Sequence, residues 1–351
     1  MQNIVKVIFV IIGTIIGAGF ASGREIYIFF NAYNEKGIYG LILSTALTGI
    51  TIYKVINLIK ENDIKDYNSL LLTINKSKKI NKIIKIIINV FLVLSYYIMV
   101  AGFSGLLEQE YGIPAIVSSI IFILICYFTL KGNIQRIINA NFFLIPILII
   151  IIVIIFFINV NLTEINLFNQ NIVQNVKYNW VVSSILYSSY NSILLIPILI
   201  GLSKNVKDKK SNMMISTICS IVTLLLGVFI YLMLLQSNNN LAIIELPLVY
   251  VIKNFGNIYA IIYTYVMIVA IYTSAISAAY GVLENYNNNI KKYNSMLLIM
   301  SILAIPIANI GFANLVNILY PIFGFLGFIQ IINILIKHRK SKEAKMLNLK
   351  K

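Results

Sequence analysis

Long apolar stretches alternate with short polar segments along the whole chain, and this pattern predicts its architecture. A helix needs about 20 consecutive apolar residues to cross the hydrocarbon core of a bilayer. Stretches of that kind recur along the sequence, so we predict an all-α integral membrane protein with ten transmembrane helices. They lie near residues 5–30, 37–59, 83–107, 114–130, 137–159, 178–202, 213–236, 255–284, 294–310 and 314–337.

The number of predicted helices indicates how the chain is organised. Ten helices divide into two sets of five, and an odd number in each set means that the second set starts from the opposite side of the membrane. Secondary transporters commonly have this inverted-repeat architecture. We therefore expect one transmembrane domain over residues 1–351, with repeats at about 5–159 and 178–337 and a basic cytoplasmic tail at 338–351.

The composition agrees with a membrane protein. The chain has 351 residues, of which 59% are hydrophobic and 11% charged, and its mean hydropathy is +0.88. Soluble globular domains are far more polar. The single histidine, His338, lies in the basic tail, and the two cysteines, Cys126 and Cys219, lie inside predicted spans. We therefore expect neither an enzyme active site nor an organic cofactor.

The positive charges are sorted to one side of the predicted membrane. With both termini in the cytoplasm, only Lys36, Lys177 and Lys253 fall on the outer side, and Arg24 lies inside the first span. The rest of the 28 Lys and Arg residues lie on the inner side, whereas the acidic residues are divided between both sides. This is the positive-inside pattern, which supports the orientation with both termini in the cytoplasm, and we expect the protein in the plasma membrane. The net charge of +16 thus reflects topology and the lipid bilayer, and no nucleic-acid partner is expected.

Three glycines lie close together near the middle of the first span, in the run Gly17-Ala18-Gly19-Phe20-Ala21-Ser22-Gly23. Glycine weakens a helix, and backbone outside a helix at membrane depth is tolerated only within protein or beside a water-filled cavity. Broken helices at the midplane mark binding sites in secondary transporters. We therefore predict a break here, with substrate contacts at Gly17, Ala18 and Gly19. Close packing of two helices through small residues is the alternative.

The inverted repeat predicts a matching break in the sixth span. Ser188, Ser189, Asn191 and Ser192 crowd the middle of that span. Such side chains hydrogen-bond their own backbone and compete with helical bonding, and Pro197 removes one further donor. We predict that this span is also broken and that Ser188, Ser189 and Asn191 line the substrate site. A polar face packed against neighbouring helices is the alternative.

Three other spans carry polar groups at similar depth. In the eighth span, Ala270, Thr273 and Ser274 share one helix face. Two adjacent hydroxyls, together with carbonyls from a broken helix, can coordinate a small hard cation. In the third span, the Tyr96 hydroxyl needs a partner, either a substrate or another helix. In the tenth span, Tyr320 belongs to a polar face that we place at the outer vestibule.

Arg24 and Glu25 follow the glycine run directly. Charged residues inside a membrane are costly and usually functional. Arg24 is a candidate for an outer gate that closes on a polar group of the tenth span. Glu25 is a candidate for binding a substrate amine, carrying a coupling proton or pairing with a cation. The alternative for both is that they extend to the outer interface. The segment 238–252 is expected to form a short outer cap.

The run Gly13-Thr14-Ile15-Ile16-Gly17-Ala18-Gly19-Phe20-Ala21-Ser22-Gly23-Arg24-Glu25-Ile26 resembles the start of the bacterial YkvI-like membrane proteins. That family is placed in the amino acid–polyamine–organocation superfamily, which has the LeuT-type fold. The resemblance extends over essentially the whole chain in the number and polarity of the spans. It implies an inverted repeat whose first and sixth spans are unwound at the centre. A substrate would lie between them, lined also by the third, eighth and tenth spans.

The resemblance also implies a sodium site and a gate. In sodium-coupled relatives, a cation lies between carbonyls of the first span and a small residue and hydroxyls of the eighth. The matching positions here are Gly13, Ile16, Ala270, Thr273 and Ser274. An arginine just beyond the break is an outer gate in some relatives, which corresponds to Arg24. The sixth span departs from many relatives because it has no glycine at its expected break.

These features together predict a secondary active transporter of amino acids or similar small zwitterionic solutes. It would work by alternating access and be coupled to sodium or to protons. The positive ends of half-helices would hold the solute carboxylate. The alternative is a membrane subunit of the same fold that senses a ligand without transporting it, as germinant receptors do.

Overall fold

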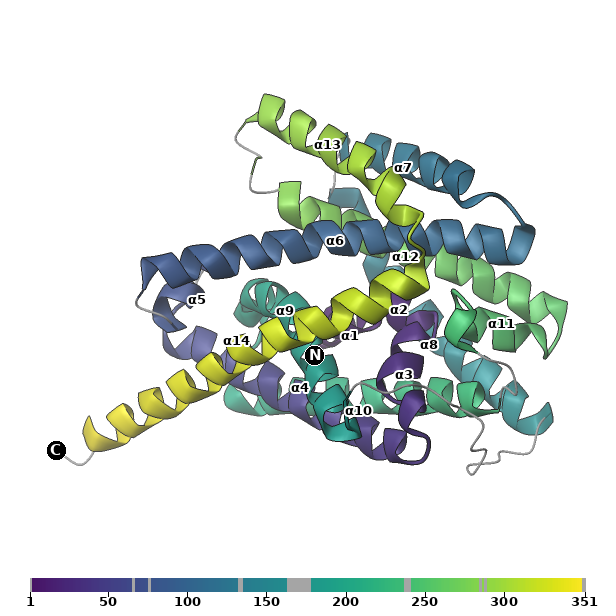
Figure 1. Cartoon of the computed structure of the whole chain (residues 1–351). Coiled ribbons are helices and arrows are strands. Elements are labelled where there is room, and N and C mark those ends of the chain that lie inside the picture. The colour runs from purple at the N-terminus through teal and green to yellow at the C-terminus, as the bar shows by residue number, and fades with distance from the viewer. Residues whose placement is uncertain are drawn as a thin grey trace.

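The computed structural model describes residues 2–64, 67–74, 77–131, 135–162, 178–236, 241–283, 286 and 289–348. Within these ranges the named elements are all helices (Figure 1). They are α1 (Gln2–Ile15), α2 (Ala18–Ala21), α3 (Arg24–Phe29), η1 (Asn31–Tyr33), α4 (Lys36–Glu61), α5 (Tyr67–Ile74), α6 (Lys78–Tyr111), α7 (Ala115–Lys131), α8 (Gln135–Leu162), α9 (Trp180–Leu202), η2 (Ser203–Asn205), α10 (Lys209–Leu235), η3 (Leu241–Ile243), α11 (Pro247–Lys253), α12 (Asn257–Leu283), α13 (Ile290–Ala308) and α14 (Phe312–Asn348).

Seven helices in the described part of the chain are long and apolar enough to cross a membrane. They are Lys36–Glu61, Lys78–Tyr111, Trp180–Asn205, Lys209–Leu235, Asn257–Leu283, Ile290–Ala308 and Phe312–Ile334. Three shorter apolar helices, Ile4–Ile15, Ala115–Lys131 and Ile145–Val160, fall in the first, fourth and fifth predicted spans. The prediction of an all-α, multi-span membrane protein is therefore confirmed.

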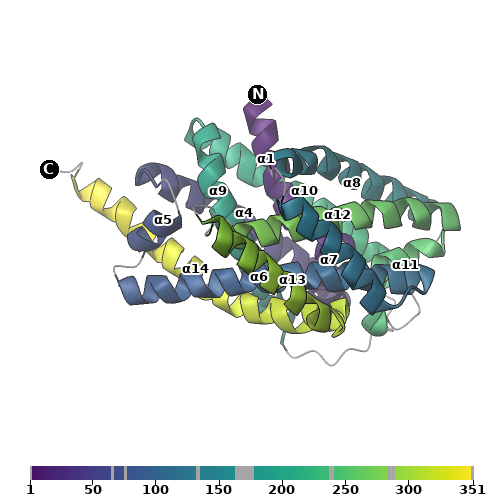
Figure 2. The ribbon, with the colours of Figure 1, turned by 90° about the horizontal axis from the view of Figure 1, so that it is seen from above.

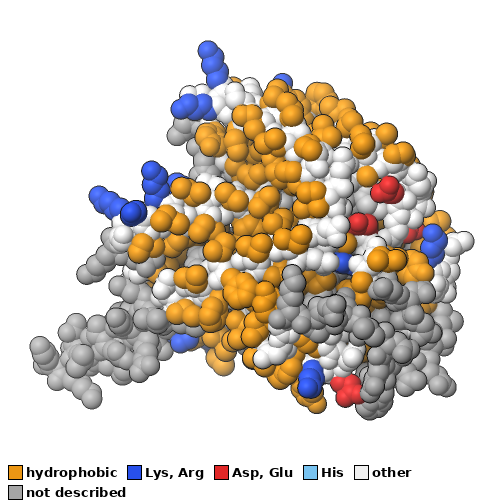
Figure 3. Space-filling model, viewed as in Figure 1, with side chains coloured by type: hydrophobic (Ala, Val, Ile, Leu, Met, Phe, Trp, Pro, Cys, Tyr) orange, Lys and Arg blue, Asp and Glu red, His pale blue; other side chains and the backbone are white. Residues whose placement is uncertain are grey.

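Charged side chains mark the two ends of the helices. On the face shown in Figure 3, most Lys and Arg side chains gather at the end where α6 begins, and acidic side chains lie near the opposite end. Hydrophobic side chains cover the surface between them. Many large apolar residues are exposed, among them Ile83, Ile86 and Val90 of α6. Such a large exposed apolar area fits contact with lipid rather than with water.

Helix α9 lies in the interior, packed between α4 and α14. Gly324 and Gly327 allow α14 to approach it closely, because a Cβ at Gly327 would collide with the carbonyl of Ser189. On another side of the molecule α6 packs along α12, and α7 and α13 pack against each other and against α6 (Figure 2). The polar residues of α9 are thus enclosed by protein.

The first segment, which we define as α1 to α3 (residues 2–29), is interrupted twice. The helical bonds of α1 end with Ile16 N donating to the Ile12 carbonyl over 2.7 Å, and helical bonding resumes with Ala21 N donating to Gly17 O over 3.0 Å. The second interruption lies at Ser22 and Gly23, where Gly23 has a φ of 77°. That left-handed conformation favours glycine. The chain therefore leaves the helix at both ends of the glycine run.

The predicted break in the sixth span is wrong, because α9 is one continuous helix from Trp180 to Leu202. Its polar side chains bond to carbonyls of the preceding turn instead of replacing the helical bonds. The Asn191 amide donates to Tyr187 O over 3.0 Å, and the Ser192 hydroxyl donates to Ser188 O over 2.7 Å. Pro197 also lies within the helix without ending it.

Two terminal or connecting regions differ from the simple span pattern. The last helix, α14, continues to Asn348, so the predicted tail at 338–351 begins as an extension of that helix. The expected cap at 238–252 contains η3 and α11. We refer to residues 241–253 as the cap segment. Most of the connection between the two predicted repeats, residues 163–177, lies outside the described residues.

Candidate functional site

The first interruption leaves backbone groups without backbone partners. Between the bond that ends α1 and the bond that begins α2, no amide in the described chain donates to the carbonyls of residues 13–16. The amides of residues 17–20 likewise have no backbone acceptor there. Ile16, Ala18, Gly19 and Phe20 are all buried. Free carbonyls and free amides are therefore concentrated in one buried stretch of the first segment.

Part of the predicted cation site lies at this interruption. A Cβ at Gly17 would lie 3.8 Å from Ser274 Oγ, so α12 meets the first segment there. The Thr273 hydroxyl donates to the Val269 and Ala270 carbonyls over 3.0 and 3.1 Å. Ser274 is thus adjacent to the free backbone groups, whereas the proton of the Thr273 hydroxyl is directed to its own helix.

Gly13 faces another helix. A Cβ at Gly13 would collide with the Ile145 side chain of α8, so its missing side chain permits close helix packing. This matches the packing alternative for small residues. The Gly13 carbonyl is nevertheless among those that receive no backbone hydrogen bond in the described chain.

The second interruption is held by specific hydrogen bonds. The Ser22 hydroxyl donates to Gly19 O over 2.9 Å and accepts from Arg24 N over 3.2 Å. From other elements, the Tyr263 hydroxyl of α12 donates to Ala21 O over 2.5 Å, and Leu248 N of α11 donates to Ser22 O over 2.8 Å. The irregular backbone is therefore paired with α12 and the cap segment.

Glu25 is turned back toward the glycine run. Its side chain is only 3% exposed. A Cβ at Gly19 would collide with Glu25 Oε1, so the carboxyl group occupies the space that the glycine leaves free. The Tyr190 hydroxyl of α9 donates a hydrogen bond to Glu25 Oε2. Gly19, predicted to contact substrate, and Glu25, predicted to act in gating or coupling, are therefore in contact.

Aromatic rings surround this carboxyl group. The Tyr190 ring stacks on Phe29 of α3 and on Tyr320 of α14, with centroid distances of 5.8 and 4.7 Å. The Tyr187 ring packs edge-on against Tyr190 and Phe29, with both centroid distances 5.4 Å. We call Glu25, Phe29, Tyr187, Tyr190 and Tyr320 the Glu25 cluster. It joins the first segment to α9 and α14.

Arg24 points to the cap segment and not to the tenth span. Its Nη1 donates to the carbonyls of Leu241 and Ile244, both over 3.1 Å. The side chain is 1% exposed, so it does not extend to the interface. Its Nε is buried and has no hydrogen-bond partner in the described chain. Arg24 therefore ties the first segment to the cap segment and keeps one donor unused.

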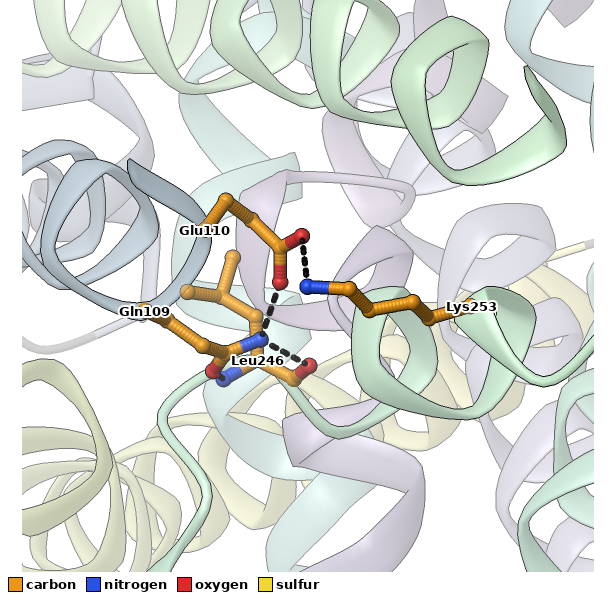
Figure 4. A network of polar contacts seen from close by, with 4 residues as sticks. All are labelled: Gln109, Glu110, Leu246 and Lys253. Atoms are coloured by element: carbon orange, nitrogen blue, oxygen red, sulfur yellow. Dashed lines mark hydrogen bonds and ion pairs between the residues drawn. The ribbon is translucent and has the colours of Figure 1, made fainter. Parts of the chain in front are cut away.

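The cap segment is also tied to α14 and α6. Ala313 N donates to Glu245 Oε2 over 2.7 Å, which places a carboxyl group at the start of α14. Burial raises the pKa of Glu245, while the Ala313 bond and the charge of Arg24 act in the opposite direction. A neighbouring network links α6 to the same segment (Figure 4). In it the Gln109 side chain bonds to Leu246, and Lys253 pairs with Glu110 over 3.4 Å.

The other predicted substrate residues are distributed over several faces. Ser188 accepts a hydrogen bond from Thr48 of α4 over 3.2 Å, and the backbone of Ser189 contacts Gly327 of α14. Asn191 bonds within α9. The Tyr96 hydroxyl lies near the side chains of Cys126 in α7 and Ser301 in α13, so it faces α7 and α13. Ser188 and Tyr96 thus point to different helices and not to one common site.

Tyr187 and Tyr190 were not predicted to belong to the site, and Tyr320 was predicted to lie at the outer vestibule. The usable signal was their polarity at mid-span, because a buried tyrosine hydroxyl requires a partner. The two tyrosines of α9 lie three positions apart and so share a helix face. The neighbouring serines instead favoured the prediction of a helix break.

Two Bacillus subtilis proteins are similar to this chain over most of its length. No protein-family model matches the chain. The uncharacterized membrane protein YkvI of Bacillus subtilis (strain 168) is 25% identical over 329 residues, which are 91% of this chain and 91% of YkvI. The uncharacterized protein YyaD of the same organism is 26% identical over 334 residues, 94% of this chain and 96% of YyaD. The resemblance to YkvI-like membrane proteins is therefore confirmed along the chain.

Solved structures share the fold. The inward-facing conformation of Mhp1, at 9% identity, superimposes with a TM-score of 0.55 over 96% of this chain and 77% of Mhp1. Mhp1 is a nucleobase-cation-symport-1 family transporter, and its closed form with bromovinylhydantoin bound gives 0.52. MhsT in complex with L-phenylalanine, at 13% identity, gives 0.56 over 95% of this chain and 91% of MhsT. The chain thus has the LeuT-type fold of secondary transporters.

Proposed function

We propose that this protein is a secondary active transporter of amino acids or similar small zwitterionic solutes, and not an enzyme. The proposed protein lies in the plasma membrane and has ten spans in an inverted repeat. The interruptions of the first segment would lie near the centre of the membrane, and both termini would lie in the cytoplasm. The sorting of Lys and Arg along the chain supports that orientation. Alternating access would move the solute past the first segment.

The single observation that carries this proposal is the stretch of free backbone groups at residues 13–20. In lipid, every unsatisfied backbone group costs several kcal/mol, so irregular backbone persists only where it meets protein, water or a ligand. Free amides suit a carboxylate, and free carbonyls suit an ammonium group or a cation. A small zwitterion supplies both kinds of partner at once.

The similar structures support this class of solute without defining it. MhsT was solved with L-phenylalanine and Mhp1 with bromovinylhydantoin, both small organic molecules. Because α9 is continuous, a second set of free half-helix amides is not available to a solute in this structure. In our proposal α9 therefore contributes side chains, above all Tyr190, and the first segment contributes backbone.

The cap segment serves as the outer closure in this proposal. Arg24 bonds to its carbonyls, and Glu245 bonds the start of α14. Opening toward the outside would require these contacts to separate. The free Arg24 Nε gives the gate one donor for a second partner during that motion.

Sodium is one candidate for the coupling ion. The contact between Gly17 and Ser274 brings a hydroxyl next to free carbonyls, as a cation site requires. We expect the double variant Thr273→Ala, Ser274→Ala to lose any sodium-dependent increase in thermal stability while still folding. The exposed Ser277, on the same helix, gives the control variant Ser277→Ala, which should keep the sodium response. A sodium response that survives the double variant excludes this cation site.

Thermal unfolding of the detergent-purified protein tests the proposed solute class. Each amino acid and simple amine would be added in sodium and in potassium buffer. A ligand that binds only the folded state stabilises it by about 2.7 kcal/mol at 100 times its dissociation constant. Solutes that raise the melting temperature would then be tested for counterflow, the exchange of labelled for unlabelled solute, in proteoliposomes.

The two outcomes of counterflow separate a transporter from a sensor. Exchange that depends on the protein and on solute inside the vesicle supports transport. Stabilisation by a solute without exchange supports the ligand-sensing subunit and removes transport. No stabilisation by any amino acid or amine contradicts the proposed solute class.

A further inference from the structure

Glu25 is a buried acid without a positively charged partner. Of its neighbours, Arg24 donates to the cap segment instead, and no Lys, Arg or His in the described chain forms an ion pair with Glu25. The neutral hydroxyl of Tyr190 donates a hydrogen bond to it. A buried carboxylate that has no cation is strongly destabilised unless it is neutralised. A proton is the simplest neutralising partner.

The groups around Glu25 come from several elements. Tyr187 and Tyr190 face it from α9, and Tyr320 faces it from α14. α2 carries no titratable side chain. On the remaining neighbours, Tyr33 of η1 interacts with Ser183, Tyr231 of α10 bonds to Asn34 O, and Lys253 of α11 pairs with Glu110. Tyr250 of α11 also has a partner. Glu25 therefore lies among neutral hydroxyls.

The hydrogen bonding suits both charge states. An ionised carboxylate only accepts hydrogen bonds, whereas a protonated carboxyl group also donates one. A tyrosine hydroxyl can donate or accept. Tyr190 can therefore bond Glu25 before and after protonation, as donor to the carboxylate and as donor or acceptor to the protonated carboxyl group.

The position of Glu25 couples it to the backbone. Its carboxyl group fills the space above Gly19, between the two interruptions of the first segment. The neutral form of Glu25 is more stable in this enclosed position than the charged form, so a change of its charge alters the free energy of moving the side chain toward water. The segment that would move is the one that carries the free backbone groups of the proposed solute site.

We propose that Glu25 is the proton-coupling group of this protein, binding one proton from the side of higher proton potential and releasing it on the other side in each transport cycle. This inference rests on the proposed transport function and names its coupling ion. Solute and proton would move together, because both stabilise the first segment in the enclosed position.

Infrared difference spectroscopy tests the protonation directly, with buffer pH as the only variable. The wild-type protein should show a pH-dependent carbonyl band of a protonated carboxyl group that disappears in Glu25→Gln. The control Glu108→Gln, an exposed acid at the end of α6, should keep that band. Tyr190→Phe, which keeps the ring, should shift the midpoint of the titration, whereas Tyr96→Phe should not. A wild-type band that persists unchanged in Glu25→Gln would overturn the proposal.

Transport provides the second measurement. Proteoliposomes with an inward pH gradient and no sodium would be given a radiolabelled mixture of the protein amino acids. Accumulation by the wild type should fall in Glu25→Gln to the level of protein-free vesicles and remain in Glu108→Gln. Accumulation that survives in Glu25→Gln removes the coupling role. If the infrared band belongs to Glu25 but the wild type neither exchanges nor accumulates amino acids, the transport function fails while the protonation site stands.

Discussion

The first segment and α9 are both apolar stretches that contain a run of small or polar residues, yet the backbone departs from helical geometry only in the first segment. In the first segment, helical bonding stops after Ile16, and Gly23 adopts a left-handed backbone. In α9, Ser188 to Ser192 stay within a continuous helix. The two regions are in direct contact through Glu25 and Tyr190.

The difference shows which residues break a buried helix. Serine and asparagine in α9 satisfy their side chains on the carbonyls one turn earlier, which is compatible with the helical ladder. The first segment has glycines where Glu25 and the cap segment need space, and at its second interruption Tyr263 and Leu248 pair the carbonyls of Ala21 and Ser22. The second interruption therefore combines a missing side chain with outside partners for the backbone, whereas the first leaves its backbone groups free.

Filling the space above Gly19 should have the largest effect. Gly19→Leu would displace the Glu25 carboxyl group from its enclosed position, because even a Cβ collides with it. We expect loss of all solute-induced stabilisation, about 2.7 kcal/mol at 100 times the dissociation constant. Gly201→Leu, at the exposed end of α9 where a Cβ would meet no atom within 4 Å, is the control and should respond normally. A normal solute response in Gly19→Leu would mean that the first interruption serves packing alone.

Removing the left-handed glycine should have the larger of the two effects expected on the free energy of unfolding. Gly23→Ala combines an unfavourable φ with crowding against Leu248, whose Cβ would lie 3.0 Å away. We expect a decrease in the free energy of unfolding of roughly 2–4 kcal/mol. Gly112→Ala, with a φ of 67° and no atom within 4 Å, isolates the backbone contribution and should decrease it by only about 1–2 kcal/mol. Denaturant unfolding of both variants gives the difference, and equal values would show that contact with the cap segment contributes nothing.

Truncating a polar side chain of α9 should have the smallest effect. Ser192→Ala removes one hydrogen bond to Ser188 O and should lower the stability by about 0.5–1 kcal/mol. Ser301→Ala, which removes a similar bond to Leu297 O in α13, should behave alike. A much larger loss in Ser192→Ala, measured by the same unfolding experiment, would indicate that this hydroxyl has a role beyond its own helix.

The sequence was sufficient to predict the class of the fold and the unusual first segment. Apolar stretches long enough to span a bilayer define the helices, since lipid leaves few alternatives. The glycine run and the adjacent charges marked Gly17, Gly19, Arg24 and Glu25, and the structure brings Gly19 and Glu25 together.

The remaining errors concern tertiary contacts. Whether serines break α9 depends on the helices around it, and α4 and α14 enclose it closely enough to favour a regular helix. Arg24 bonds carbonyls of the cap segment, which no periodic pattern predicts. The Glu25 cluster joins residues 165 positions apart in the sequence, and only the packed structure brings them together.

Hydrogen–deuterium exchange of the intact protein tests the central claim most directly, which is that the interrupted first segment binds solute while α9 remains a continuous helix. The probe is the amino acid that gives the largest increase in melting temperature. We predict faster exchange in peptides covering residues 14–26 than in those covering 183–195, and slower exchange in 14–26 when that amino acid is added. Equal protection of the two regions, or protection that appears only in α9, would contradict the account.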